Sequence, residues 1–217
     1  HPLEAERATS MAHLPGENAG YLRANGVPDV PPERQLPSPA SFFGTWYAPA
    51  TPDYLLGDED DIPLGDGRSL HVIWTPGHTP GHCCLLLEPG GILFVGDHLL
   101  PKITPHVGLW PGGPENPLGD FLASHEKIQK CDARLVCPAH GPIYEDHRRR
   151  ARQLIDFHRV RKLAMLEEIR RRPLTAFEVA LAVFAISADN RFQVMAATVE
   201  TLAHLELLRR EGRALRT

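Results

Sequence analysis

Residues 75–82 read T-P-G-H-T-P-G-H and directly follow residues 70–74, in which apolar and polar side chains alternate as in a half-buried strand. Two other stretches share this design: F-V-G-D-H at 94–98 and C-P-A-H-G at 137–141. In each stretch an apolar strand ends and a side chain able to bind a metal ion follows at once. The three stretches therefore predict polar chemistry at the ends of strands.

Histidines and one aspartate stand at these predicted strand ends, far apart in the sequence. The ends of neighbouring strands can bring such residues together. Imidazole nitrogens and a carboxylate are suitable ligands for Zn²⁺ and similar divalent ions. Glycines beside each of them let the backbone turn sharply. The sequence therefore predicts a metal site at one edge of a sheet.

In this order, the three motifs resemble the later motifs of the metallo-β-lactamase-fold hydrolases. The resemblance implies an α+β fold, an αββα sandwich with one or two Zn²⁺ ions at the edge of its two sheets. It implies that His82 binds the first metal, that Asp97 bridges both, and that His140 binds the second. It also gives Asp97 a catalytic role in orienting the attacking hydroxide. His78 and His98 match neighbouring positions, for which the resemblance implies supporting roles.

The leading motif of this family, H-x-H-x-D-H, does not occur in the chain. The resemblance covers residues 65–217, and His1 already looks like sequence downstream of that motif. We therefore expect an N-terminally incomplete sandwich, truncated before its first strands, whose exposed sheet edges could pair with another copy. With two protein ligands left for each ion, we expect weak, partial or absent metal and little activity.

Charge divides the chain into two parts. Residues 1–147 carry a net charge of −11 and residues 148–217 a net charge of +7. This split favours a lactamase-like domain at 1–147 and a separate C-terminal domain at 148–217. The tail resembles the winged-helix extension of one subgroup of the family, and a strand at 213–216 would complete such a domain.

Hydrophobic periodicity and turn residues predict the individual elements. Helices are expected at 2–14, 18–25, 118–130, 148–171, 176–184 and 190–210, with Pro15-Gly16 ending the first of them. Strands are expected at 70–74, 84–88, 92–95 and 134–137, and the proline-rich residues 27–53 are expected to form a loop. Thr175 and Glu178 have the spacing of a capping box.

The resemblance implies a metal-dependent hydrolase of a thioester, a lactone or another ester-type small molecule. T-P-G-H-T-P-G-H also resembles the hydroxyacylglutathione hydrolases, which favours thioesters slightly. Two alternatives stay open: an endoribonuclease of the lactamase-like type, and a non-catalytic winged-helix module that binds nucleic acid. A serine hydrolase is excluded because no G-x-S-x-G elbow occurs.

Composition narrows the setting of the protein. The 217 residues are 42% apolar, enough for a core, and no run of 18 apolar residues suggests a membrane span. The four cysteines are too few for a disulfide scaffold and are expected to be structural thiols in a reducing, cytoplasmic setting. They are Cys83, Cys84, Cys131 and Cys137. A small-molecule substrate is expected, and a homodimer stays open.

Overall fold

The computed structural model describes residues 1–5, 15–29 and 51–216. The chain divides into two compact units. The first comprises His1–Glu6, Pro52–Val107 and Pro117–His158, and the second comprises Arg7–Thr51, Gly108–Asn116 and Arg159–Thr217. The β-sheet lies in the first unit, whereas most of the C-terminal helical residues lie in the second.

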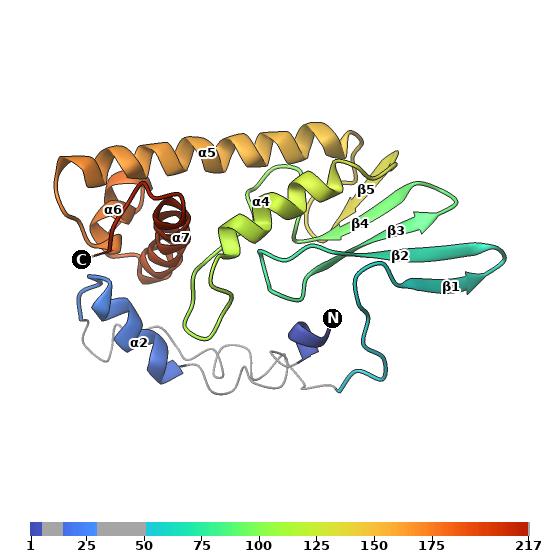
Figure 1. The fold of residues 1–217 in the computed structure, drawn as a ribbon, viewed down its shortest axis with the longest axis horizontal. Helices are drawn as coiled ribbons and strands as arrows, with labels where there is room; N and C mark the ends of the chain where they lie inside the picture. Colours follow the sequence, from blue (N-terminus) through green and yellow to red (C-terminus); the bar gives the residue numbers. More distant parts are fainter. Residues whose placement is uncertain (6–14, 30–50, 217) are drawn as a thin grey trace. The chain divides into compact units, whose positions relative to one another are not determined.

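Five strands form one mixed sheet in sequence order (Figure 1). They are β1 (Asp61–Gly65), β2 (Arg68–Trp74), β3 (Cys83–Glu88), β4 (Ile92–Gly96) and β5 (Leu135–Pro138). The first three pairs are antiparallel and β4–β5 is parallel. A parallel pair needs a crossover connection, and this one contains α4 (Pro117–Ile128). The four predicted strands are confirmed, whereas β1 was not predicted.

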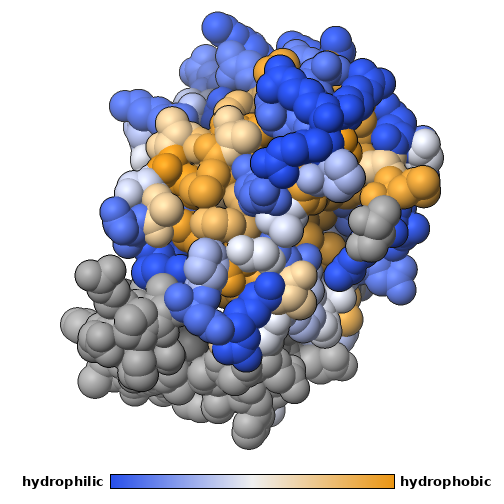
Figure 2. Space-filling view, turned by 90° about the vertical axis from the view of Figure 1, so that its left-hand side faces the viewer, coloured by the Kyte–Doolittle hydropathy of each residue, from blue (hydrophilic) through white to orange (hydrophobic). Residues whose placement is uncertain are grey.

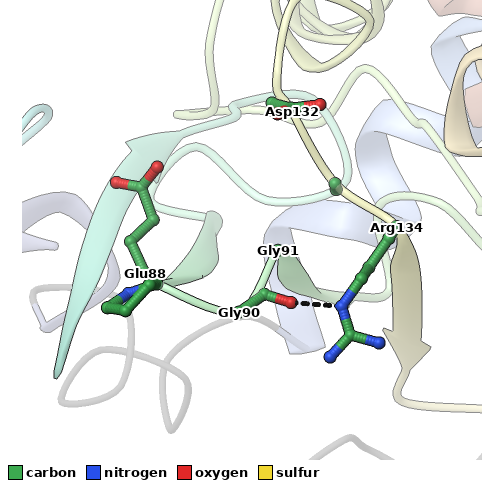
Figure 3. Close-up of a pocket in the computed structure, with 7 residues that line it drawn as sticks. Glu88, Gly90, Gly91, Asp132 and Arg134 are labelled. Carbon is green, nitrogen blue, oxygen red and sulfur yellow. Dashed lines mark hydrogen bonds between the residues drawn. The ribbon is translucent and has the colours of Figure 1, made fainter.

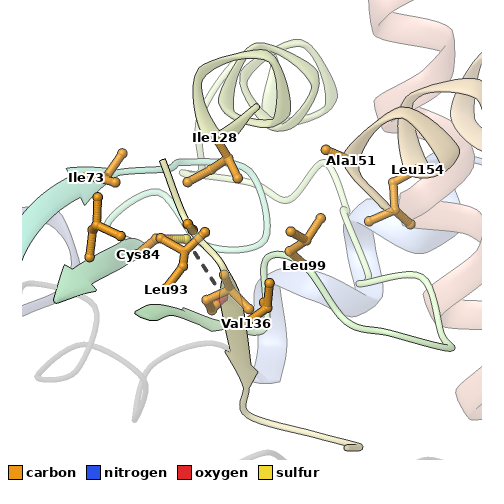
Figure 4. Close-up of a cluster of buried hydrophobic side chains, with 11 residues drawn as sticks. Ile73, Cys84, Leu93, Leu99, Ile128, Val136, Ala151 and Leu154 are labelled. Atoms are coloured by element: carbon orange, nitrogen blue, oxygen red, sulfur yellow. Dashed lines mark hydrogen bonds between the residues drawn. The ribbon is translucent and has the colours of Figure 1, made fainter. Parts of the chain in front are cut away.

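One face of the sheet packs against α4 and the first part of α5 (His147–Arg171), and this contact forms the core of the first unit (Figure 4). Pleating directs alternate residues to this face, so Leu86, Leu93 and Val136 are neighbours across three strands. The full cluster is Ile73, Cys84, Leu86, Leu93, Val95, Leu99, Ile128, Ala133, Val136, Ala151 and Leu154.

The opposite face of the sheet is apolar as well. The strand register aligns Val72, Leu85, Phe94 and Cys137 across β2 to β5. Val72 is buried, Leu85 and Cys137 are half-buried, and Phe94 is 41% exposed. A sheet with two apolar faces is typical of a layer that is covered on both sides. This pattern agrees with the α+β sandwich expected from the sequence.

The second unit contains α2 (Pro15–Ala24), the rest of α5, α6 (Ala176–Val183) and α7 (Arg191–Arg210). The capping box that begins α6 is confirmed: Thr175 accepts a hydrogen bond from the Glu178 amide, and the Glu178 carboxylate accepts one from the Thr175 amide. Figure 2 faces the end where α5, α6 and α7 lie in Figure 1 and shows an apolar area bordered by polar residues. Exposed apolar side chains of these helices include Val160 and Phe192.

Two element predictions were wrong. Residues 213–216 form no strand, so the helices of the predicted winged helix are present without that terminal strand. Pro15 begins α2 instead of ending a helix, because a proline is tolerated in a first helical turn, where its missing N–H has no intrahelical partner. Of the predicted helix at 2–14, residues 2–5 are helical and the remainder lies outside the described residues.

Most of the predicted loop at 27–53 also lies outside the described residues. The predicted division at residue 147 stays a prediction, since α5 runs unbroken from His147 to Arg171 and the two compact units share it. No helix in the described part of the chain combines the length and apolar composition that crossing a bilayer requires.

Candidate metal centre

The carboxyl ends of three strands meet at one edge of the sheet. β4 and β5 are parallel, and β2 runs in the same direction as β4 because both are antiparallel to β3. The turn 75–82 follows β2, Asp97 follows β4, and His140 follows β5 closely. Strand direction therefore brings together groups that are distant in the sequence.

Asp97 is the centre of this arrangement. Its Oδ1 lies 3.4 Å from Nε2 of His140, and its Oδ2 lies 3.8 Å from Nε2 of His78. The Asp97 side chain is one-third exposed, yet its Oδ1 atom is buried and has no hydrogen-bond partner among the described residues. A buried carboxylate oxygen without a partner is costly, so this site favours a cation or a donor beside Asp97.

The tautomer of His78 suits metal binding. Its Nδ1 donates a hydrogen bond to the backbone carbonyl oxygen of His106 at 2.8 Å. Because a carbonyl only accepts, the ring proton sits on Nδ1 and leaves the Nε2 lone pair free on the side of Asp97. A carbonyl that fixes the ring in this way is the usual partner of a metal-binding histidine.

The separation of the Asp97 carboxylate from each imidazole fits two ligands of one metal ion, although the three side chains together do not bring one ligand atom each within 4.8 Å of one another. Two ligand atoms that are each about 2.0–2.1 Å from a tetrahedral Zn²⁺ lie about 3.3 Å apart. The separations from Asp97 to His140 and His78 are 3.4 and 3.8 Å. Two imidazoles and one carboxylate are also a donor set that Zn²⁺ uses in proteins.

His82 lies on the inner side of this group. Its Nδ1 is hydrogen-bonded to the buried Thr75 hydroxyl at 2.8 Å, and its Nε2 lies against the backbone of Gly96. A Cβ atom at Gly96 would lie 2.6 Å from that Nε2. Burial, and then repulsion from His78, lower the pKa of His82 to about 4. His82 is therefore neutral at neutral pH.

His98 and His125 form a second, deeper pair. Both rings are fully buried, and their centroids are 4.2 Å apart. Burial, followed by repulsion between the two rings, lowers the pKa of His98 well below its ordinary value. Burial likewise lowers the pKa of His125 to about 3. The two imidazoles therefore pack as neutral rings behind the metal centre.

Helix α4 holds the histidine-bearing turn in place. Ser124 donates a hydrogen bond to the carbonyl oxygen of Pro76 at 2.8 Å. Gly77 has φ +141°, and a Cβ there would lie 2.5 Å from Cβ of Phe121. On the other side, the Gly81 amide donates to the carboxylate of Glu4 at 3.2 Å. The conformation of this turn therefore depends on contacts that are distant in the sequence.

An open hollow of the first unit lies elsewhere, at the opposite edge of the sheet (Figure 3). Its volume is about 440 Å³, and it is lined by the turn Glu88–Gly91 and by Asp132, Ala133 and Arg134. Nε of Arg134 donates to the carbonyl oxygen of Gly90 at 2.6 Å. Since β4 and β5 begin here, this hollow is separate from the ligand-bearing strand ends.

Comparison with known proteins identifies the family. The sequence model of the metallo-beta-lactamase superfamily matches residues 16–140, more than half of the chain. The chain belongs to the metallo-beta-lactamase superfamily. Members of this superfamily are generally hydrolases, which agrees with the class expected from the motifs.

Two solved members of the superfamily are similar in structure. A metallo-beta-lactamase family protein from Thermus thermophilus has a TM-score of 0.77 and 33% identity, covering 94% of this chain and 63% of its own. A beta-lactamase domain protein from Burkholderia ambifaria has a TM-score of 0.78 and 28% identity, covering 99% of this chain and 59% of its own. Both likenesses extend over nearly all of the chain.

Curated members match over shorter stretches. An atrochrysone carboxyl ACP thioesterase of Aspergillus fumigatus is 30% identical over 51% of this chain and 33% of its own length. A beta-lactamase-like protein 2 homolog of Drosophila melanogaster is 28% identical over 68% of this chain and 48% of its own length. The chain thus spans about a third to a half of these relatives.

The sequence pointed to the motif residues of this superfamily member, but not to the side chains and carbonyl groups that contact them. His78 and His140 both lie within 4 Å of Asp97, the Asp97 charge also acts on the pKa of His82, and His98 is fully buried; the roles expected for these residues stay predictions. Thr75 begins the T-P-G-H-T-P-G-H motif but was given no role, and the His106 carbonyl carried no sequence signal. All four cysteines are free, and burial raises the pKa of Cys84 to about 12, so its thiol stays protonated.

Proposed function

We propose that this protein is a metal-dependent hydrolase with His78, Asp97 and His140 as metal ligands. The observation that carries the proposal is the Asp97 carboxylate, whose two oxygens lie 3.4 and 3.8 Å from imidazole nitrogens at the edge where strand ends converge. Relative to the family resemblance, this proposal exchanges the roles of His78 and His82. His78 becomes a ligand, and His82 becomes part of its support.

Each residue has a distinct task in this proposal. His140 is 69% exposed and offers its Nε2 at the open side, where a substrate can enter. His78 is held by the His106 carbonyl, so its lone pair is directed before any ion arrives. Asp97 balances the positive charge and accepts a hydrogen bond from water. When bound, Zn²⁺ lowers the pKa of water towards about 7 and polarises a substrate carbonyl.

Three protein ligands are enough for one metal ion but not for two. Catalytic zinc sites usually have three protein ligands, and the H-x-H-x-D-H string, from which the family resemblance expects further ligands for both ions, does not occur in these 217 residues. We therefore propose that this chain binds a single divalent ion, weakly.

The proposed substrate class is a thioester or a related carboxylic ester. Two similar curated proteins, from Aspergillus fumigatus and Aspergillus terreus, are named atrochrysone carboxyl ACP thioesterases, at 30% and 33% identity. The chain covers only 33% and 26% of their lengths, so these names support the reaction class and not a particular acyl group. A carbonyl electrophile also suits an open site with one activated water.

Nucleic acid takes second place because several basic side chains of the tail form ion pairs with carboxylates of the same tail. Arg161 pairs with Glu200, Lys162 with Glu211, and Arg209 and Arg210 both with Glu206. Near the start of α5, Arg148 and Arg150 donate to backbone carbonyl oxygens. The winged-helix assignment of residues 148–217 stays a prediction, as do a homodimer and a cytoplasmic location.

A substrate panel tests the proposal. The zinc-loaded chain should hydrolyse short acyl thioesters or aryl esters, and its activity should fall by at least about tenfold in His78→Ala and Asp97→Asn. His71→Gln, which changes a histidine on β2 away from the site, is the matched control and should keep wild-type activity. Equal activity of all three variants and the wild type would contradict the proposal, as would RNA cleavage without any ester hydrolysis.

A further inference from the structure

We infer that His82 is a positioning residue: together with Thr75 it fixes the backbone of the Gly96–Asp97 turn, and thereby holds the Asp97 carboxylate between its two imidazole neighbours. The inference rests on the ligand set proposed above and adds to it the device that places those ligands. A positioning residue of this kind lowers metal affinity when it is lost, without itself touching the ion.

One side of the His82 ring is anchored to the β2–β3 hairpin. Its Nδ1 is hydrogen-bonded to the Thr75 hydroxyl, and the Thr75 amide donates to the His82 carbonyl oxygen at 2.9 Å. Thr75 is fully buried, and its hydroxyl also contacts Sγ of Cys84 on β3 at 3.4 Å. The imidazole is therefore fixed from its Nδ1 side within a rigid part of the sheet.

The other side of the ring faces the turn after β4. Gly96 has φ +48° and lies so close to Nε2 of His82 that a side chain would not fit between them. The Gly96 carbonyl accepts a hydrogen bond from the Ala139 amide at 2.9 Å. Gly96 precedes Asp97, and Ala139 precedes His140. A shift of Gly96 would therefore move two proposed ligands together.

The same turn is held from its far side by His98. The His98 ring lies 5.6 Å from the His82 ring and 4.2 Å from the His125 ring, between centroids. Phe121 on α4 meets the edge of the His98 ring at 5.1 Å. Asp97 thus sits on a turn whose two flanking residues are both packed against imidazoles. This geometry gives His82 a role in placing Asp97 through the backbone of Gly96.

Substitutions of Thr75 test the inference without touching any proposed ligand. Thr75→Val keeps the shape but loses the hydroxyl, whereas Thr75→Ser keeps the hydroxyl. We expect Thr75→Val to weaken Zn²⁺ binding by about 10- to 100-fold and Thr75→Ser to restore most of it. At saturating Zn²⁺, His82→Ala should still bind one ion per chain, whereas His78→Ala should bind none. His71→Gln is the matched histidine control.

A second measurement works on the metal-free chain. The His98 amide is bonded to the Val95 carbonyl and the Ala139 amide to the Gly96 carbonyl. In Thr75→Val and His82→Ala, hydrogen exchange at these two amides should become at least about tenfold faster, with no change in Thr75→Ser or His71→Gln. This readout does not depend on activity or on metal.

The outcomes separate the two proposals. If His82→Ala abolishes stoichiometric binding while His78→Ala retains it, His82 is the ligand, and both the positioning role and the proposed ligand set are overturned. If His78→Ala abolishes binding but Thr75→Val and His82→Ala match wild type in affinity and exchange, only the positioning role is overturned. If the wild-type chain binds no Zn²⁺, the proposed function fails for this chain, and amide exchange alone decides the positioning role.

Discussion

The imidazole of His98 lies against that of His125, with ring centroids 4.2 Å apart and both rings fully buried. Neither ring nitrogen of His125 has a hydrogen-bond partner among the described residues. A charge on either ring would be desolvated and would repel its neighbour, so the fold accepts both only as neutral groups. This relationship makes the stability of the protein depend on pH.

Acid should destabilise the protein through His125. Burial lowers the pKa of His125 from 6.5 to about 3. As the pH falls below 6.5, this histidine therefore becomes protonated in the unfolded chain but stays neutral in the folded chain, which favours unfolding. Stability that is complete at pH 7 is therefore lost progressively, by about 2 kcal/mol at pH 5 for one such group. His125→Leu should shrink the difference in unfolding free energy between pH 7 and pH 5 by about this amount, measured by urea unfolding with a chelator present.

The control for that experiment is Ile128→Val on the same helix. It removes one methylene group from the core and should lower stability by about 1 kcal/mol at both pH values. A pH difference that stays unchanged in His125→Leu would contradict the assignment of a neutral buried imidazole.

Gly77→Ala should disturb the turn that carries His78, and through it the candidate metal centre. Its φ of +141° and the 2.5 Å approach of Phe121 leave no room for a Cβ. Gly67, with φ +78° and no neighbour within 4 Å, is the matched control for backbone strain alone. We expect Gly67→Ala to cost about 1–2 kcal/mol. Gly77→Ala should cost about 1–3 kcal/mol more, by thermal or urea unfolding, and should weaken Zn²⁺ binding. Equal effects would argue against the contact with Phe121.

Two adjacent residues of β4 test how strongly each face of the sheet contributes to stability. Leu93 is fully buried in the core, whereas Phe94 points to the other face and is 41% exposed. Leu93→Ala should cost about 2–5 kcal/mol of unfolding free energy. Phe94→Ala should cost less than half as much and should reduce binding of a hydrophobic dye to the folded chain. A larger loss at Phe94 would mean that a further layer covers this face.

Loss of the cap of α6 should weaken the second unit. The Thr175 hydroxyl accepts a hydrogen bond from the Glu178 amide, and the Thr175 amide donates one to the Glu178 carboxylate. Thr175→Ala should lower the unfolding free energy by about 1 kcal/mol, and Thr175→Ser, which keeps the hydroxyl, should lower it by much less. Urea unfolding followed by circular dichroism would measure both, and equal loss in the two variants would show that the hydroxyl is not the cause.

Local sequence was sufficient to predict four of the five strands and the types of residue at the candidate site. The alternation at 70–74 and the apolar run at 92–95 predicted β2 and β4, because a strand buries alternate or successive apolar residues wherever it sits. The spacing of Thr175 and Glu178 predicted a cap, because its hydrogen bonds lie within one helical turn. Motif residues at strand ends marked where the proposed ligands lie.

Only the tertiary structure decided which histidine meets Asp97. His78 and His82 occupy equivalent positions in the repeated P-G-H of one turn, so local pattern cannot rank them. Their surroundings differ: His78 meets the carbonyl of His106, whereas His82 meets Thr75 and Gly96. These partners come from separate segments of the chain. The direction of a ring depends on such contacts, and strand order and packing create them only when the chain folds.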